Sequence, residues 1–139
     1  MVFLALLVFC CGGCLPAASQ TALPPATATL EPGKGSLTGQ IQHTAQTWHD
    51  QPLHIYAAAY YGEPDGSGIY MLDPDRGPSA TLAADGSFVL DSLPPGSYLL
   101  VAGPSAEEGR RVVDAGQQPV LFLVQPGTRQ ELGALALEP

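Results

Sequence analysis

The residues that could do chemistry gather in the first half of the chain, and three of them are histidines. His43, His49 and His54 lie within 12 residues of one another, and neutral imidazoles can bind zinc or copper. No cysteine lies near them, and Asp50 is the only carboxylate beside them. We therefore interpret them as solvated side chains and predict no metal site, with a zinc or copper site as the weaker alternative.

A second group of polar side chains is acidic and lies in a stretch rich in Gly and Pro. Glu63, Asp65, Asp73 and Asp75 could offer several oxygens to a hard cation. However, the stretch lacks the Asp-x-Asp-x-Asp-Gly spacing of a calcium loop, and turns are rich in Asp for conformational reasons alone. The sequence leaves open whether the loop at 62–78 binds calcium.

Aromatic residues cluster around one predicted strand and the loops beside it. Exposed aromatic rings can stack on sugar rings while Asp, Gln and His bind hydroxyl groups, and a patch of them marks an interaction site. The alternative is that these rings only cover one sheet face and cap the core. If there is a ligand platform, the predicted binding residues are Trp48, His54, Tyr56, Tyr60 and Tyr70.

Nothing in the sequence demands catalysis, and we predict no enzyme activity and no cofactor. No histidine begins the His-x-x-Glu pair of a zinc carboxypeptidase, and neither a Gly-x-Ser-x-Gly elbow nor a phosphate-binding Walker loop occurs. The chain has 13 acidic and 5 basic residues, a net charge of −8. Nucleic-acid binding needs clustered Lys and Arg to neutralise phosphates, so we exclude it.

The elements that hold these residues follow a distinctive amino-terminal segment. Residues 2–9 are an uninterrupted apolar run, too short to span a bilayer and typical of a signal peptide. Gly12 and Gly13 precede Cys14 and resemble the end of a bacterial lipobox. We predict a lipoprotein signal over 1–14 with lipidation at Cys14. Cys10 or Cys11 as the modified residue, and an uncleaved apolar anchor, are the alternatives.

A lipid anchor and a tether place the rest of the chain outside the cytoplasmic membrane. Several acyl chains on one cysteine hold a protein at a membrane almost permanently. Residues 15–35 are rich in Pro, Ala and Thr without periodicity, which predicts a disordered linker of up to about 60 Å. The predicted location is the outer side of the cytoplasmic membrane or the outer membrane; Leu15 after the cysteine favours the latter in a Gram-negative source.

The remaining residues predict a single all-β domain over 36–138. Period-2 alternation indicates strands over 36–42 and 53–61. The second strand should turn Tyr56 and Tyr60 toward solvent or a partner. Shorter strands are predicted at 68–72, 80–83, 88–90, 98–101, 111–113, 120–124 and 130–137, with the strand at 120–124 central in the sheet. We predict a Greek-key β-sandwich of about seven strands, Ig-like or prealbumin-like.

One stretch of turns and strands carries a family resemblance. Asp85 and Gly86 form a pair typical of a two-residue hairpin turn, and Pro94-Pro95-Gly96 forces a corner before an apolar strand. Together with Phe88, Leu93, Tyr98 and an upstream Gly39, the pattern resembles the carboxypeptidase regulatory-like family of transthyretin-like sandwiches. Starch-binding-like and prealbumin-like sandwiches are the alternatives.

The resemblance implies a non-catalytic surface module of a bacterial cell envelope. We therefore predict a structural or protein-interaction role, with an envelope protein as partner. The alternative is a carbohydrate-binding module that uses its exposed aromatics to bind a polysaccharide. A metal-binding or hydrolytic protein is the weakest of the three hypotheses.

Overall fold

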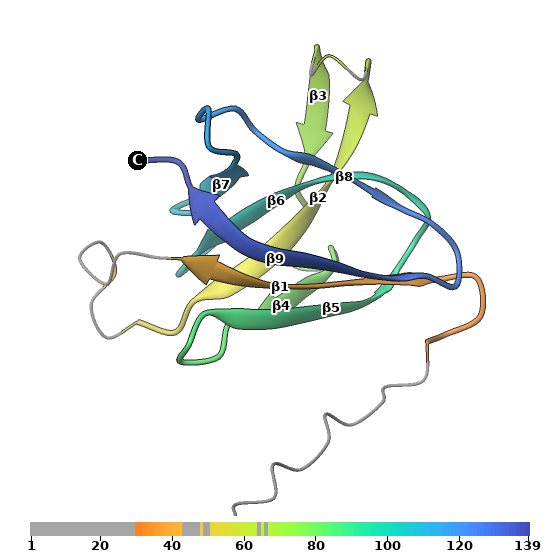
Figure 1. Ribbon diagram of the computed structural model, residues 1–139, viewed down its shortest axis with the longest axis horizontal. Helices are drawn as coiled ribbons and strands as arrows, with labels where there is room; N and C mark the ends of the chain where they lie inside the picture. The colour runs from red at the N-terminus through yellow and green to blue at the C-terminus, as the bar shows by residue number, and fades with distance from the viewer. Residues whose placement is uncertain (1–29, 43–47, 49–50, 64, 66) are drawn as a thin grey trace, which may run out of the picture.

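A computed structural model shows an all-β protein (Figure 1), which confirms the predicted fold class. It describes residues 30–42, 48, 51–63, 65 and 67–139, and within these residues it contains no helix. The lipobox with Cys14, most of the tether, His43 and His49 lie outside the described residues. The described residues form nine strands, one at each of the nine predicted stretches, although the sandwich was expected to have about seven: β1 (Gly35–Gln42), β2 (His54–Gly62), β3 (Gly68–Met71), β4 (Ser79–Thr81), β5 (Ser87–Leu93), β6 (Gly96–Gly103), β7 (Arg110–Val113), β8 (Leu121–Val124) and β9 (Arg129–Leu137).

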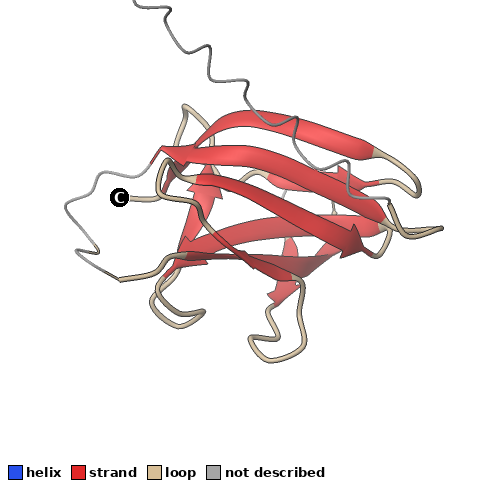
Figure 2. Cartoon of the chain, turned by 90° about the horizontal axis from the view of Figure 1, so that it is seen from below, coloured by secondary structure: helices blue, strands red, loops and turns tan. Residues whose placement is uncertain are grey.

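The strands form one curled mixed sheet in the order β3-β2-β6-β7-β9-β1-β5. Strand β4 pairs with β2, and β8 pairs with β6, off this path. Strand β7 pairs with β6 on one side and with β9 on the other, so it links two layers that face each other across the core (Figure 2). The first and last strands, β1 and β9, lie side by side and parallel. This arrangement does not confirm the predicted Greek-key order.

Alternating side chains build the core between the two layers. Where a strand faces the core, every second residue points into it, as period-2 patterning requires. Leu37 and Ile41 enter the core from β1, and Ile55 and Ala57 enter it from β2. The buried cluster consists of Leu37, Ile41, Ile55, Ala57, Leu82, Phe88, Leu90, Leu93, Tyr98, Leu100, Ala102, Val112, Phe122 and Val124. The core therefore draws on most strands of both layers.

The predicted corner at Pro94-Pro95-Gly96 carries the chain from one layer to the other. Strand β5 pairs with β1, whereas β6 pairs with β2. The hydroxyl of buried Tyr98 donates a hydrogen bond of 2.8 Å to the carbonyl oxygen of Pro94, which fixes the corner to the strand that leaves it. Burial, with a smaller contribution from Tyr61, raises the pKa of the Tyr98 hydroxyl. The tyrosine therefore stays a neutral donor.

The turn at Asp85 and Gly86 differs from the predicted two-residue hairpin. The amide of Gly86 donates to the carbonyl of Ala83, and the amide of Ala83 donates to the carbonyl of Ser87. These bonds close a three-residue loop in which Gly86, with φ of 82°, takes the left-handed position. The two strands that flank the turn lie in different layers, because β4 pairs with β2 and β5 pairs with β1. The turn therefore carries the chain from one layer to the other.

The strand at 120–124 is shorter and more peripheral than predicted, and its central placement was wrong. Strand β8 covers 121–124, and among the strands of the described residues it pairs with β6 alone. The side chain of Leu123 is 59 % exposed. Pro119 and Pro126 bracket the strand, and proline cannot donate a ladder hydrogen bond. High β-propensity here reflects a half-covered edge position rather than the centre of the sheet.

Candidate functional site

Strand β2 positions most of the predicted binding residues, but its outer face is less open than predicted. Tyr56 is 9 % exposed and Ala58 is fully buried. They lie opposite Val101 and Leu99 of β6, which are also buried. The prediction that this whole face meets solvent or a partner was therefore wrong for Tyr56, which is buried with Ser79 of β4 on one side and Val101 of β6 on the other. The ring of His54 lies 6.2 Å from that of Tyr56.

Trp48 does not join the tyrosines. The guanidinium carbon of Arg110 lies 5.5 Å from the centre of the Trp48 ring, within the range of a cation–π contact. Arg110 and Arg111 are adjacent on β7, so their side chains leave opposite faces of the sheet. Arg111 lies with Tyr70 on the outer face. The structure therefore separates Trp48 from the pair of tyrosines that line the outer surface.

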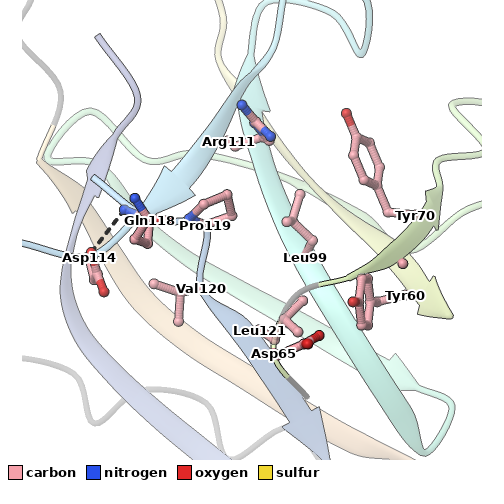
Figure 3. Close-up of a pocket in the computed structure, with 11 residues that line it drawn as sticks. Tyr60, Asp65, Tyr70, Leu99, Arg111, Asp114, Gln118, Pro119, Val120 and Leu121 are labelled. Atoms are coloured by element: carbon pink, nitrogen blue, oxygen red, sulfur yellow. Dashed lines mark hydrogen bonds between the residues drawn. The ribbon is translucent and has the colours of Figure 1, made fainter. Parts of the chain in front are cut away.

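Tyr60 and Tyr70 face each other across β2 and β3 and line a hollow of about 630 Å³. Figure 3 shows the two rings on one side, Asp114 and Gln118 on the other, and Leu99 between them. The far wall belongs to the segment that connects β7 to β8. Of the predicted binding residues, these two tyrosines are the pair that the structure brings together around a hollow.

The polar groups of this hollow are held by their own loops. The hydroxyl of Tyr60 donates a 3.0 Å bond to the carbonyl of Glu63. Partial burial, followed by the nearby charges of Asp65 and Glu63, raises the pKa of this hydroxyl. One carboxylate oxygen of Asp114 accepts the amides of Gly116 and Gln118 at 2.8 and 3.0 Å. The hollow can therefore offer carboxylate oxygens and a phenol to a ligand.

The acidic loop at 62–78 uses its carboxylates to build turns. Asp65 accepts the amide of Ser67 at 2.8 Å, and Asp73 accepts the amides of Asp75 and Arg76 at 3.1 and 3.0 Å. Both are the local side-chain-to-backbone bonds typical of Asp in turns. The side-chain and backbone bonds from Ser67 lower the pKa of Asp65. Within the described residues, no three His, Cys, Asp or Glu side chains come together as metal ligands do.

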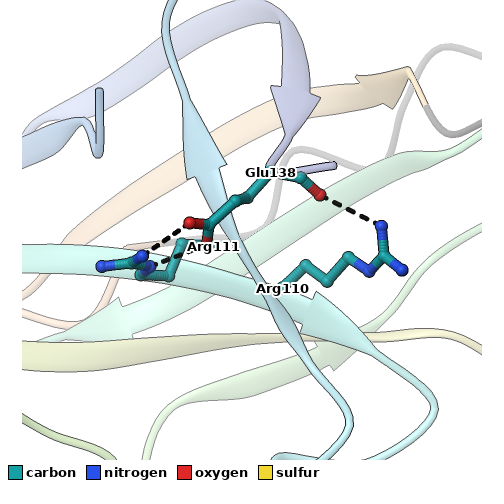
Figure 4. A network of polar contacts seen from close by, with 3 residues as sticks. All are labelled: Arg110, Arg111 and Glu138. Carbon is teal, nitrogen blue, oxygen red and sulfur yellow. Dashed lines mark hydrogen bonds and ion pairs between the residues drawn. The ribbon is translucent and has the colours of Figure 1, made fainter. Parts of the chain in front are cut away.

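An ion pair lies on the outer face of the sheet, beside the hollow (Figure 4). Arg111 donates from Nε and from one terminal nitrogen to the two carboxylate oxygens of Glu138, at 2.9 and 2.6 Å. These bonds raise the pKa of Arg111 and lower that of Glu138. Arg110 reaches the other way and donates to the backbone carbonyl of Glu138 at 3.3 Å. The guanidinium of Arg111 is thus already engaged by protein.

The hairpin of β2 and β3 carries an exposed apolar surface, of which the sequence analysis singled out Tyr60 and Tyr70 but not Tyr61, Ile69 or Met71. Tyr61, Ile69, Tyr70 and Met71 are 59 %, 66 %, 47 % and 63 % exposed. Figure 1 shows this hairpin rising from the body of the sheet. The residues of β3 alone do not indicate this exposure, because the equally unbroken apolar run of β6 is buried on both faces.

Comparisons with protein families and with curated proteins find no relative of this chain. No family model matches the sequence, and no curated protein matches it. The resemblance to carboxypeptidase regulatory-like domains stays a prediction. The described residues also include no helix of the length and apolar character needed to cross a membrane.

Proposed function

We propose that the chain is a non-catalytic, lipid-anchored module of a cell envelope that acts by binding another envelope protein. The observation that carries this proposal is the exposed apolar hairpin of β2 and β3. Four of the six large hydrophobic side chains that are exposed in the described residues lie on it: Tyr61, Ile69, Tyr70 and Met71. Exposed apolar patches of this kind mark interaction sites.

Cross-linking in intact cells tests the interaction. A photo-reactive amino acid at Tyr70 is expected to capture a partner protein. The same amino acid at Val89 is the matched control, because Val89 is 49 % exposed and Tyr70 is 47 % exposed, yet Val89 lies on β5 at the opposite end of the sheet order. Equal capture at both positions, or none at Tyr70, contradicts the proposal.

The anchor has a separate test. Lipidation at Cys14 predicts that the protein partitions into the detergent phase and that Cys14→Ser moves it to the aqueous phase. Cys10→Ser and Cys11→Ser serve as controls, because only the modified cysteine should matter. Partitioning that persists in Cys14→Ser places the anchor elsewhere, while the binding proposal stands on its own.

A carbohydrate-binding module is the second candidate, and the hollow beside Tyr60 and Tyr70 favours it. Aromatic rings, two carboxylates and an amide around one hollow can bind a sugar by stacking and by hydrogen bonds to hydroxyl groups. On a glycan array, Tyr70→Ala should then abolish binding while Trp48→Ala leaves it unchanged. Equal loss in both variants contradicts a site in this hollow.

A further inference from the structure

The β2–β3 hairpin ends the sheet in an open edge. Strand β3 pairs with β2 from Ala59↔Met71 to Gly62↔Gly68, and no other strand of the described residues pairs with it. An edge strand presents a row of backbone donors and acceptors that a further strand can bind. The open edge of β3 is four residues long.

The register identifies which backbone groups point outward. The amide of Glu63 donates to the carbonyl of Ser67 at 3.1 Å, so this pair occupies a hydrogen-bonded position of the hairpin. In an antiparallel ladder such pairs alternate with pairs that are not bonded to each other. Counting along the strands, Ile69 and Met71 are bonded to β2, whereas Gly68 and Tyr70 turn their N–H and C=O groups away from it.

The edge lacks the protection that soluble proteins usually give such strands. Charged side chains, prolines and bulges discourage pairing at an edge, and β3 contains only Gly, Ile, Tyr and Met with no shift in register. The opposite edge, β5, does carry these devices: Asp91 lies within the strand, and Ser92 has a φ of 58°. The contrast between the unprotected edge at β3 and the protected edge at β5, the two ends of the strand order, indicates that β3 binds a further strand.

The charges around β3 decide which strand fits. Glu63 and Asp65 lie before the strand, and Asp73 and Asp75 follow it, with Arg76 as the single basic residue of the loop. Two copies of the chain paired edge to edge and antiparallel would bring the acidic start of one β3 beside the acidic end of the other. Like charges this close repel, so self-pairing is disfavoured. A strand with basic ends is attracted at both ends.

We propose that the open edge of β3 binds an extended segment of a partner protein, apolar in the middle and flanked by Lys or Arg, which adds to the sheet as a further strand. The N–H and C=O groups of Gly68 and Tyr70 would hold its backbone. Ile69 and Met71 would contact its side chains on one face and Tyr70 those on the other. This inference rests on the proposed interaction role and names the kind of partner.

Peptide binding to the full chain in detergent tests this proposal. The probe is a fluorescein-labelled peptide of alternating Val and Thr between two pairs of Lys, and its binding is followed by fluorescence anisotropy. The same peptide with Glu in place of Lys should bind at least about tenfold weaker, since acidic ends meet acidic loops. Methylation of alternate backbone nitrogens on the Lys peptide should weaken binding by a similar factor.

Two substitutions of Tyr70 distinguish the contribution of its backbone N–H from that of its side chain. Tyr70→Pro removes an N–H that points away from β2, which an edge strand tolerates, and is expected to weaken binding of the Lys peptide at least tenfold. Tyr70→Ala keeps that N–H and should weaken it less than threefold. Circular dichroism checks that both variants fold. As a second variant, Met71→Lys places a protective charge on the edge and should also weaken binding.

Several results would overturn the proposal. These are no binding of the Lys peptide, equal binding of the Lys and Glu peptides, or full binding by Tyr70→Pro. A dimer in sedimentation that Tyr70→Pro abolishes would show that a second copy occupies the edge instead. If cross-linking at Tyr70 captures a partner while the peptide fails to bind, strand addition is wrong and the interaction role stands. If neither occurs, both fail.

Discussion

At the residue scale, the bond from Tyr98 to the corner is the clearest single contribution to stability. We expect Tyr98→Phe to cost about 1 kcal/mol of unfolding free energy, because the buried ring still fills its place but the carbonyl of Pro94 loses its donor. Urea unfolding measures this cost. Tyr60→Phe is the control, because its hydroxyl bonds a carbonyl in an exposed loop, so a loss as large as that of Tyr98→Phe contradicts the account.

The ion pair of Arg111 and Glu138 predicts a pH dependence. Hydrogen bonds from Arg111 lower the pKa of Glu138 below its ordinary value of 4.5. A lowered carboxyl pKa contributes stability that is present above that ordinary value and is lost as the pH falls through the folded-state pKa. The melting temperature of the wild type should therefore exceed that of Glu138→Gln above about pH 5, and the gap should close in acid.

Thermal unfolding between pH 3 and pH 7 measures that gap. Glu131→Gln is the matched control, because it removes the same charge from an exposed position on β9. A gap between wild type and Glu138→Gln that stays constant with pH would show that the ion pair does not stabilise the fold.

At the scale of the element, β7 is a short strand that pairs with both layers. Val112 is fully buried in it. Val112→Ala removes buried methyl groups and leaves a cavity at this junction, so we expect a loss of about 2 kcal/mol. Val89→Ala is the same change on β5, where the side chain is 49 % exposed, and should cost less than about 0.5 kcal/mol. Equal losses in urea unfolding would contradict the bridging role.

The sequence predicted best those features that depend on residues close together in the chain. The alternation of apolar and polar residues, together with the turn residues, located the ends of β1, β2 and β3 to within two residues. Both signals depend only on residues that are neighbours in the chain. They misjudged β8 and the face of Tyr56. Which strand lies beside another depends on contacts between distant residues, such as Tyr56 with Val101, and single-strand patterning does not contain that information.

The candidate site likewise combines features that the sequence predicted with features that depend on long-range contacts. The sequence singled out Tyr60 and Tyr70, and the register of β2 with β3 brings them together. It also grouped Trp48 with them, although Arg110 and Arg111 on β7 divide the two regions between opposite faces. The open edge of β3 became visible only with the order of the strands, because whether a strand is central or peripheral is a property of the whole sheet.

At the scale of the whole molecule, the fold depends on pairing its first strand with its last. Strand β9 lies between β1 and β7, with Ile41 opposite Leu135 on one side and Val112 opposite Leu137 on the other. It therefore joins the layer of β1 and β5 to the layer of β2 and β6. Without β9, no strand pairing of the described residues joins the two layers. They stay connected through the chain itself, through backbone hydrogen bonds such as that from Gly127 to Lys34, and through side-chain packing across the core.

This topology predicts that removal of β9 abolishes cooperative folding. A shortened chain ending at Thr128 exposes the β1 side of the core, where Leu37 and Ile41 are now fully buried, and should show no sigmoidal unfolding transition in urea by circular dichroism. A chain beginning at Leu30 is the matched control, because it loses more residues but none of the nine strands β1 to β9. It should keep the transition midpoint of the full chain. A sigmoidal transition with an undiminished m-value in the chain without β9 would show that the layers hold together without this strand.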